Sequence, residues 1–256
     1  MSELVEFEIA QQADISRASV CAQRTMRRIP RIPRLTRRCS TAAARHDVAA
    51  ITTEVSIDAL DGMRLHLLSS NDVPDSVTEP WWALLWPGGH ALASHILRHP
   101  SAFRGRVVDV GSGSGVVGIA AALAGASSVV VNDLSLHAAA AASLNAEANG
   151  VRVSSLTADI IGSEPADHFS PGDCVVVGDV LYDPDVARRM LPWLQRLAAF
   201  GVEATVGDPG RPVSAEYFAS MELLEEVELP AILPSEVYWE HFGAVRASVW
   251  RVAEPP

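Results

Sequence analysis

Lysine is absent from this chain of 256 residues. All 20 basic residues are arginine, against 31 acidic residues, and the formal net charge is −11 at pH 7. Phosphate contacts dominate binding to nucleic acids, so an acidic chain of this kind is a poor nucleic-acid binder. The balance favours cationic ligands, basic protein segments or simply an ordinary acidic surface.

Long apolar runs and paired cysteines are also missing. No stretch of about 18 uncharged apolar residues occurs, so we expect no membrane span. The three cysteines, Cys21, Cys39 and Cys174, are scattered and form no Cys-x-x-Cys spacing. This pattern argues against a disulfide framework or a thiolate metal site and is typical of a reducing, cytoplasmic location. The hydrophobic content of 48% is sufficient for a real core.

The arginines are concentrated near the N-terminus. Residues 1–45 hold nine arginines and four acidic residues, and the stretch RTMRRIPRIPRLTRRCSTAAAR has no apolar period. It lacks the continuous apolar core of a secretory signal. We expect residues 1–48 to form a disordered extension and residues 49–256 to form the domain. An over-extended start codon and a targeting or docking arm are the alternatives.

Strand and helix patterns alternate through the rest of the chain. TTEVSIDALDGMRLHLLSS predicts two strands around an Asp61-Gly62 turn. Beyond it, short strands that are apolar on both faces alternate with helices, as in a parallel sheet covered by helices. The segments MELLEEVELPAIL and VYWEHFGAVRASVWRV alternate like an antiparallel pair. We predict an α/β fold, a doubly wound Rossmann-like seven-stranded sheet with an antiparallel last strand, preceded by a small N-terminal β-hairpin.

The stretch VVDVGSGSGVVG, residues 107–118, places glycines directly after a strand. Its Gly-x-Gly-x-x-Gly spacing satisfies the dinucleotide fingerprint, which would indicate a nucleotide-binding oxidoreductase. However, Asp109 stands two residues before Gly111, where dinucleotide folds usually keep an apolar residue. A catalytic Tyr-x-x-x-Lys pair is also impossible in a chain without lysine. The surrounding residues therefore favour a different nucleotide ligand.

The same stretch resembles the first motif of the class I S-adenosylmethionine-dependent methyltransferases. The matching residues are Asp109, Gly111, Gly113 and Gly115, and Asp133 at the end of VVVND matches the second motif. The resemblance implies S-adenosylmethionine as cofactor. Glycines let the backbone approach that ligand closely, and a carboxylate can accept both ribose hydroxyl protons.

Three further stretches resemble the family of electron-transfer flavoprotein β-subunit lysine methyltransferases, which shares its pattern with the nicotinamide N-methyltransferase-like group. They are PWWALLWPGG (80–89), GDVLYD (178–183) and VGDPGR (206–211). The resemblance implies that Asp179 and Tyr182 face the transferred methyl group, that Trp86 contacts the cofactor and that Asp159 reads the adenine edge. Asp208 and Arg211 of the third stretch are candidates to shape the substrate mouth. The residues alone leave plainer interpretations open: Trp86 packs the hairpin onto the sheet, Asp159 caps a loop and DPG forms a β-turn after a strand.

The resemblance implies an N-methyltransferase whose partner is a protein substrate with an exposed lysine. A methyltransferase for a small nicotinamide-like amine and a binding module without turnover are the alternatives. His95 and His99 have a spacing that could bind zinc, but no third ligand accompanies them in the sequence, so we expect no metal. Asn145 matches an asparagine of the family, but it also fits a helix-surface polar residue, and we leave it out of the site.

Overall fold

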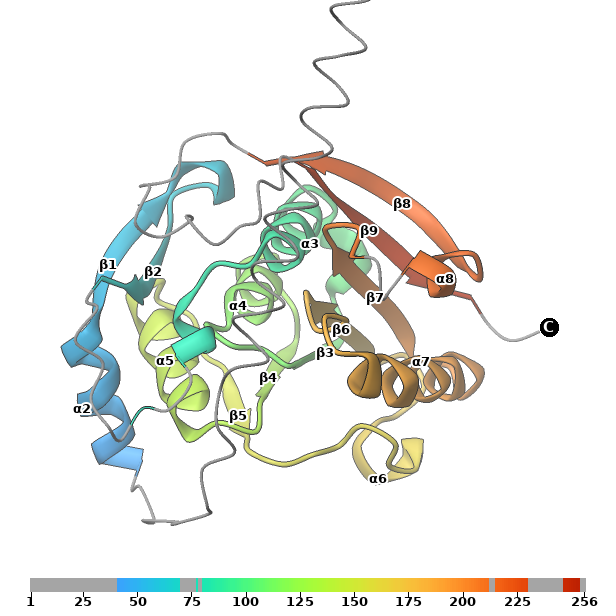
Figure 1. Ribbon diagram of the computed structural model, residues 1–256, viewed down its shortest axis with the longest axis horizontal. Coiled ribbons are helices and arrows are strands. Elements are labelled where there is room, and N and C mark those ends of the chain that lie inside the picture. The colour runs from blue at the N-terminus through green and yellow to red at the C-terminus, as the bar shows by residue number, and fades with distance from the viewer. Residues whose placement is uncertain (1–40, 70–76, 78–79, 212–214, 230–245, 254–256) are drawn as a thin grey trace, which may run out of the picture.

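The computed structural model describes residues 41–69, 77, 80–211, 215–229 and 246–253 (Figure 1). A seven-stranded sheet has the order β5-β4-β3-β6-β7-β9-β8. Five strands are parallel, and β9 is antiparallel to both β7 and β8. The predicted sheet and its antiparallel last strand are confirmed. The strands are β3 (Arg106–Val110), β4 (Ser128–Asn132), β5 (Ser154–Leu156), β6 (Cys174–Gly178), β7 (Glu203–Asp208), β8 (Met221–Glu228) and β9 (Arg246–Val252).

Helices cover both faces of this sheet, which explains why its central strands β3 and β6 are mostly apolar and buried on both faces. Val107 and Val176 face the core beneath one set of helices, while Val108 and Val175 face the other core. The first set is α3 (Pro87–Arg98), α4 (Val116–Leu123) and α5 (Leu136–Ala148), and α7 (Pro184–Ala199) covers the second face. Two short helices, α6 (Pro165–His168) and α8 (Ala215–Phe218), and three 3-10 turns, Asp58–Leu60, Pro80–Ala83 and Pro100–Phe103, complete the described elements.

The predicted N-terminal hairpin is present as β1 (Thr52–Ile57) and β2 (Met63–Leu68). The strands pair antiparallel, with Thr52 opposite Leu68 and Ile57 opposite Met63. Both predicted turn residues have left-handed backbone angles, φ +54° at Asp61 and +75° at Gly62. Asp tolerates this region better than most residues, and glycine adopts it without steric cost.

A helix that was not predicted, α2 (Thr41–Ile51), precedes the hairpin and packs against α5. Ala44, Val48 and Ile51 recur at helical spacing and are buried in a cluster with alanines of α5. Residues 41–48, which we assigned to the extension, therefore pack on the folded domain. Residues 1–40 lie outside the described residues. None of the described helices is long and apolar enough to cross a membrane.

The strand order reverses direction at β3. From β3 the chain builds outward to β4 and β5 and then returns to place β6 on the other side of β3. In open α/β sheets, ligands bind beyond the carboxyl ends of the strands at such a reversal. The glycine loop after β3 and Asp179 after β6 both lie at this point.

Candidate active site

The glycine loop after β3 requires glycine for two separate reasons. Gly111 and Gly115 have φ values of +70° and +80°, a region that side chains rarely adopt. A Cβ atom would also lie 2.5 Å from a methyl carbon of Val180 at the first position and 2.7 Å from the Cβ of Ala142 at the second. The loop is therefore packed tightly between the β6–α7 connection and α5.

Asp109 is buried beside this loop, and one of its oxygens has no partner among the described residues. Its Oδ2 accepts a hydrogen bond from the Gly118 backbone N–H at 2.8 Å. Its Oδ1 and the hydroxyl of Ser112 are both buried and have no hydrogen-bond partner within the described part of the chain. Burial raises the pKa of Asp109 to about 7, the nearby Asp133 adds to the rise, and the hydrogen bond from Gly118 opposes it. Unpaired buried polar atoms beside a glycine cradle fit a polar, cationic ligand such as S-adenosylmethionine.

Asp133, after β4, contacts the same loop. Its Oδ2 accepts from the Gly113 N–H at 3.0 Å and its Oδ1 from the Ser135 N–H at 2.9 Å. Burial raises the pKa of Asp133, while hydrogen bonds from the backbone N–H groups of Ser135, Gly113 and Leu134 oppose the rise. The two motifs that carry the methyltransferase resemblance therefore meet in space, and Asp133 positions the middle of the glycine loop.

Asp179 lies beyond β6, and both of its carboxylate oxygens are occupied. Its Oδ2 accepts from the Gly88 N–H at 2.7 Å, and its Oδ1 accepts from Arg211 Nε and Nη2 at 2.7 and 2.5 Å. Trp86, the residue before α3, provides no side-chain cap. Asp179 therefore satisfies a backbone N–H in the first turn of α3, which would otherwise lack a partner. Its own backbone has φ +61°, an unfavourable angle for a non-glycine residue.

Four glycines bring α3 against the ends of β6 and β7. A Cβ atom on Gly88 would lie 2.4 Å from the Gly207 carbonyl oxygen, and one on Gly207 would lie 2.1 Å from the Gly88 oxygen. A Cβ atom on Gly178 would lie 2.8 Å from the Cα of Gly89. We call Gly88, Gly89, Gly178 and Gly207 the glycine joint. This backbone-to-backbone contact places the start of α3 within hydrogen-bonding distance of Asp179.

Arg211 connects Asp179 to Trp86. The Arg211 guanidinium carbon lies 5.9 Å from the centre of the Trp86 ring, and the ring nitrogen of Trp86 donates to the Trp81 carbonyl at 2.9 Å. The Asp208 carboxylate accepts from the backbone N–H groups of Gly210 and Arg211 at 2.7 and 2.9 Å. The stretch VGDPGR therefore ends β7 at Asp208 and then turns, and the turn delivers Arg211 to Asp179. We considered Asp208 and Arg211 for the substrate mouth but did not include Arg211 among the site residues, although an arginine after a turn at a strand end was the available signal.

Tyr182 and Asp159 lie further out. The Tyr182 side chain is 53% exposed and directly precedes Asp183, which caps α7. Asp159 is exposed, and its two oxygens accept from the Ile161 N–H at 3.1 Å and from Arg189 Nη2 at 2.7 Å. These are the contacts of a loop cap, the plainer of the two interpretations of Asp159.

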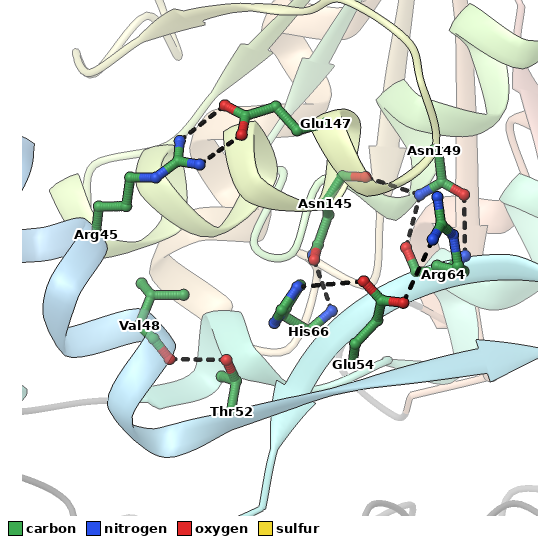
Figure 2. Close-up of polar contacts among 9 residues, drawn as sticks. All are labelled: Arg45, Val48, Thr52, Glu54, Arg64, His66, Asn145, Glu147 and Asn149. Atoms are coloured by element: carbon green, nitrogen blue, oxygen red, sulfur yellow. Dashed lines mark hydrogen bonds and ion pairs between the residues drawn. The ribbon is translucent and has the colours of Figure 1, made fainter.

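Asn145 of α5 joins the hairpin to the glycine loop. It is fully buried, and its Oδ1 accepts from the His66 N–H at 2.6 Å (Figure 2). Its Nδ2 donates to the Ser114 carbonyl at 2.8 Å. One turn later, Asn149 exchanges hydrogen bonds with the backbone N–H and carbonyl of Arg64. The expectation of a helix-surface asparagine was therefore wrong, because a second element covers this side of α5.

The chain is similar in sequence to known methyltransferases. The model of the ribosomal protein L11 methyltransferase (PrmA) family matches residues 90–197. The mouse electron transfer flavoprotein β-subunit lysine methyltransferase is 36% identical over 176 residues, which cover 68% of this chain and 67% of the mouse protein.

Two solved structures share the fold at lower identity. A putative SAM-dependent methyltransferase from Streptococcus mutans is 12% identical, with a TM-score of 0.52, and the match covers 79% of this chain and 56% of that protein. A putative methyltransferase complexed with SAH is 14% identical, with a TM-score of 0.53 and the same coverage. These two likenesses support the fold.

Proposed function

This chain belongs to the family of electron transfer flavoprotein β-subunit lysine methyltransferases, and from this membership we propose that it methylates a lysine of the electron transfer flavoprotein β subunit. Family membership makes the chain an S-adenosylmethionine-dependent protein-lysine methyltransferase. The target protein and the roles of individual residues are the proposal. Its main support is two groups of contacts at the carboxyl ends of β3, β4 and β6. The first contact set is the glycine loop with Asp109 and Asp133, and the second is Asp179 with Arg211.

The first contact set would hold the cofactor. S-adenosylmethionine, when bound, supplies the methyl group and a positive sulfonium charge. Asp109 and Ser112 offer buried polar atoms without a partner in the described residues, and the loop glycines leave the backbone bare. Asp133 anchors the loop and offers its remaining lone pairs to the ribose hydroxyl groups. We expect Trp86 to border this site, because it directly precedes the helix that Asp179 caps.

The second contact set would control the protonation of the incoming lysine. A lysine with a pKa near 10.4 carries a cost of about 4.6 kcal/mol to present its neutral amine at pH 7. A lone carboxylate beside it would raise that cost by stabilising the ammonium. Here Arg211 already neutralises Asp179 through two hydrogen bonds. We infer that Asp179 holds Arg211 and α3 in place, and that the Arg211 charge favours loss of the lysine proton before attack.

Large apolar side chains exposed near these contacts support a protein as the second substrate. Trp81, Tyr182 and Leu134 are exposed by 36%, 53% and 70%, and they lie before α3, after β6 and after β4 respectively. Aromatic side chains are enriched at protein-binding surfaces, so these exposed positions at the ends of elements that carry the site are the candidates for substrate contact. We place Tyr182 where it would line the path of the lysine side chain.

A transfer assay tests the proposal. Labelled S-adenosylmethionine, the chain and recombinant electron transfer flavoprotein are combined, and labelled residues are located by mass spectrometry. Parallel reactions contain nicotinamide or a cell lysate in place of the flavoprotein. Label on a β-subunit lysine supports the proposal, whereas label only on nicotinamide, or only on other proteins of the lysate, contradicts it. Asp179→Asn is expected to bind cofactor and lose transfer by about 10²-fold.

A paired comparison tests the cofactor residues. Asp133→Ala is expected to weaken cofactor binding at least tenfold, while Asp159→Ala, whose oxygens are occupied by Ile161 and Arg189, retains it. An equal loss of cofactor affinity in both variants would indicate that Asp159 does contact the adenine edge of the cofactor. We retain a reducing cytoplasmic compartment as a proposal, which the three scattered cysteines support.

A further inference from the structure

A second group of ligand-bearing side chains lies at the opposite end of α3 from Asp179. His95 and His99 are four residues apart at the end of this helix, and Glu225 comes from β8. One potential ligand atom from each of the three residues lies within 4.8 Å of the other two. No third ligand stands near the two histidines in the sequence. The fold supplies one, because Glu225 lies 126 positions after His99 in the chain and beside it in space.

The hydrogen bonds of His99 leave it ready to bind a cation. Its Nδ1 lies 3.0 Å from the carbonyl oxygen of His95. A carbonyl can only accept, so Nδ1 donates, and Nε2 carries a lone pair in the neutral ring. A histidine that binds a metal commonly donates its other ring N–H to a carbonyl in this way.

The carboxylate of Glu225 is oriented from both sides. Its Oε1 accepts from Arg98 Nη2 at 2.6 Å, and its Oε2 lies 2.7 Å from His95 Nδ1. Arg98 also donates to the hydroxyl of Ser94. With Arg98 on Oε1, the second oxygen remains directed at the histidines.

We propose that His95, His99 and Glu225 bind a zinc ion. Two imidazoles and one carboxylate are a known zinc ligand set, with water completing the tetrahedron. A single zinc ion about 2.1 Å from each ligand spans at most about 4.2 Å. The ligand atoms therefore move closer together on binding, and the proton between His95 Nδ1 and Glu225 moves to His95 Nε2 as Nδ1 binds the ion.

The position of the site indicates a structural or regulatory role. The residues between the histidines are Ile96, Leu97 and Arg98. None of them is the glutamate that acts as general base in His-Glu-x-x-His zinc hydrolases. The ion would instead fasten α3, whose first turn is held by Asp179, to β8.

Zinc binding by the full-length, untagged chain tests this inference. Competition with a chromophoric chelator is expected to give one zinc ion per chain, with affinity at least tenfold weaker in His99→Ala and in Glu225→Gln. Both changes avoid the buried His95. His46→Ala is the matched control, because His46 is also exposed and its removal should leave zinc affinity unchanged.

Thermal unfolding provides a second measurement that requires neither cofactor nor protein substrate. Zinc at 100 times its Kd is expected to raise the Tm of the parent chain by about 5 °C and that of His99→Ala by much less. Equal zinc affinity in all four proteins, or no binding at micromolar zinc, would overturn the proposal. Either result leaves the methyl-transfer proposal unaffected.

Discussion

Arg211 donates two hydrogen bonds to one oxygen of Asp179, while the other oxygen caps the first turn of α3. The Asp179 side chain is fully buried and that of Arg211 is 15% exposed. One carboxylate therefore connects the ends of β6 and β7 to the start of a helix that lies far earlier in the chain.

Arg211→Ala is expected to destabilise the fold by about 3–5 kcal/mol, because it leaves a buried carboxylate without its partner. Methyl transfer should also fall, by about 10²-fold, as α3 and Trp86 shift. Urea unfolding and a transfer assay measure the two effects. Arg188→Ala, which removes an exposed ion pair with Asp185, serves as control and should cost less than about 1 kcal/mol. Similar losses in both variants would contradict the argument.

Gly88→Ala is expected to cost at least 2 kcal/mol and to reduce transfer, because its Cβ atom would meet the Gly207 carbonyl at 2.4 Å. Gly89→Ala is the neighbouring control. Its Cβ atom meets nothing closer than a Val116 methyl carbon at 3.5 Å, so helix propensity predicts a neutral or slightly stabilising change. Denaturant midpoints of the two variants decide the matter, and a stable, active Gly88→Ala would refute the close contact.

Asp109 is expected to make stability depend on pH. Its pKa rises from 3.8 in the unfolded chain to about 7 in the fold, so between about pH 4 and 7 the folded chain holds a proton that the unfolded chain has released. The free energy of unfolding therefore falls as pH rises through this window, by about 4 kcal/mol in total. Asp109→Asn should remove this contribution, which urea unfolding at pH 5 and pH 8 would measure. An unchanged pH dependence in the variant would show that Asp109 does not cause it.

Asn145→Ala is expected to weaken S-adenosylmethionine binding about tenfold, because the Ser114 carbonyl of the glycine loop and the His66 N–H both lose their partner. Asn149→Ala removes similar contacts to β2 but none to the glycine loop, and cofactor affinity should be retained. Isothermal titration of the two variants with cofactor compares them. A weaker cofactor affinity in both would mean that the hairpin, rather than the loop contact, controls binding.

Local patterns predicted the parallel core well, and the reason is physical. Strands such as Val175–Val177 are buried on both faces, so their apolar runs are continuous, and in β3 only Asp109 interrupts the run before Val110. The spacing of Asp109 and the glycines after it is likewise a local requirement of one tight turn.

Contacts between distant segments were not visible in the same way. Asp179 with Arg211, Asn145 with Ser114 and His95 with Glu225 depend on which strands become neighbours, and a single sequence does not display strand order. Helix α2 was missed for another reason. Its buried face consists of Ala44, Val48 and Ile51 alone, and so small a stripe beside an arginine-rich stretch gives a weak periodic signal.

The contact between Gly88 and Gly207 in the glycine joint limits how such an enzyme can diversify. A contact made only of main-chain atoms has no side-chain rotamers to adjust, so it tolerates neither gradual substitution nor compensating repacking. Selection for a new target protein would therefore leave Gly88 and Gly207 unchanged and act on exposed positions such as Trp81 and Tyr182. The main-chain contact and the exposed positions are separate sets of residues. A change of target protein therefore need not disturb the geometry of methyl transfer.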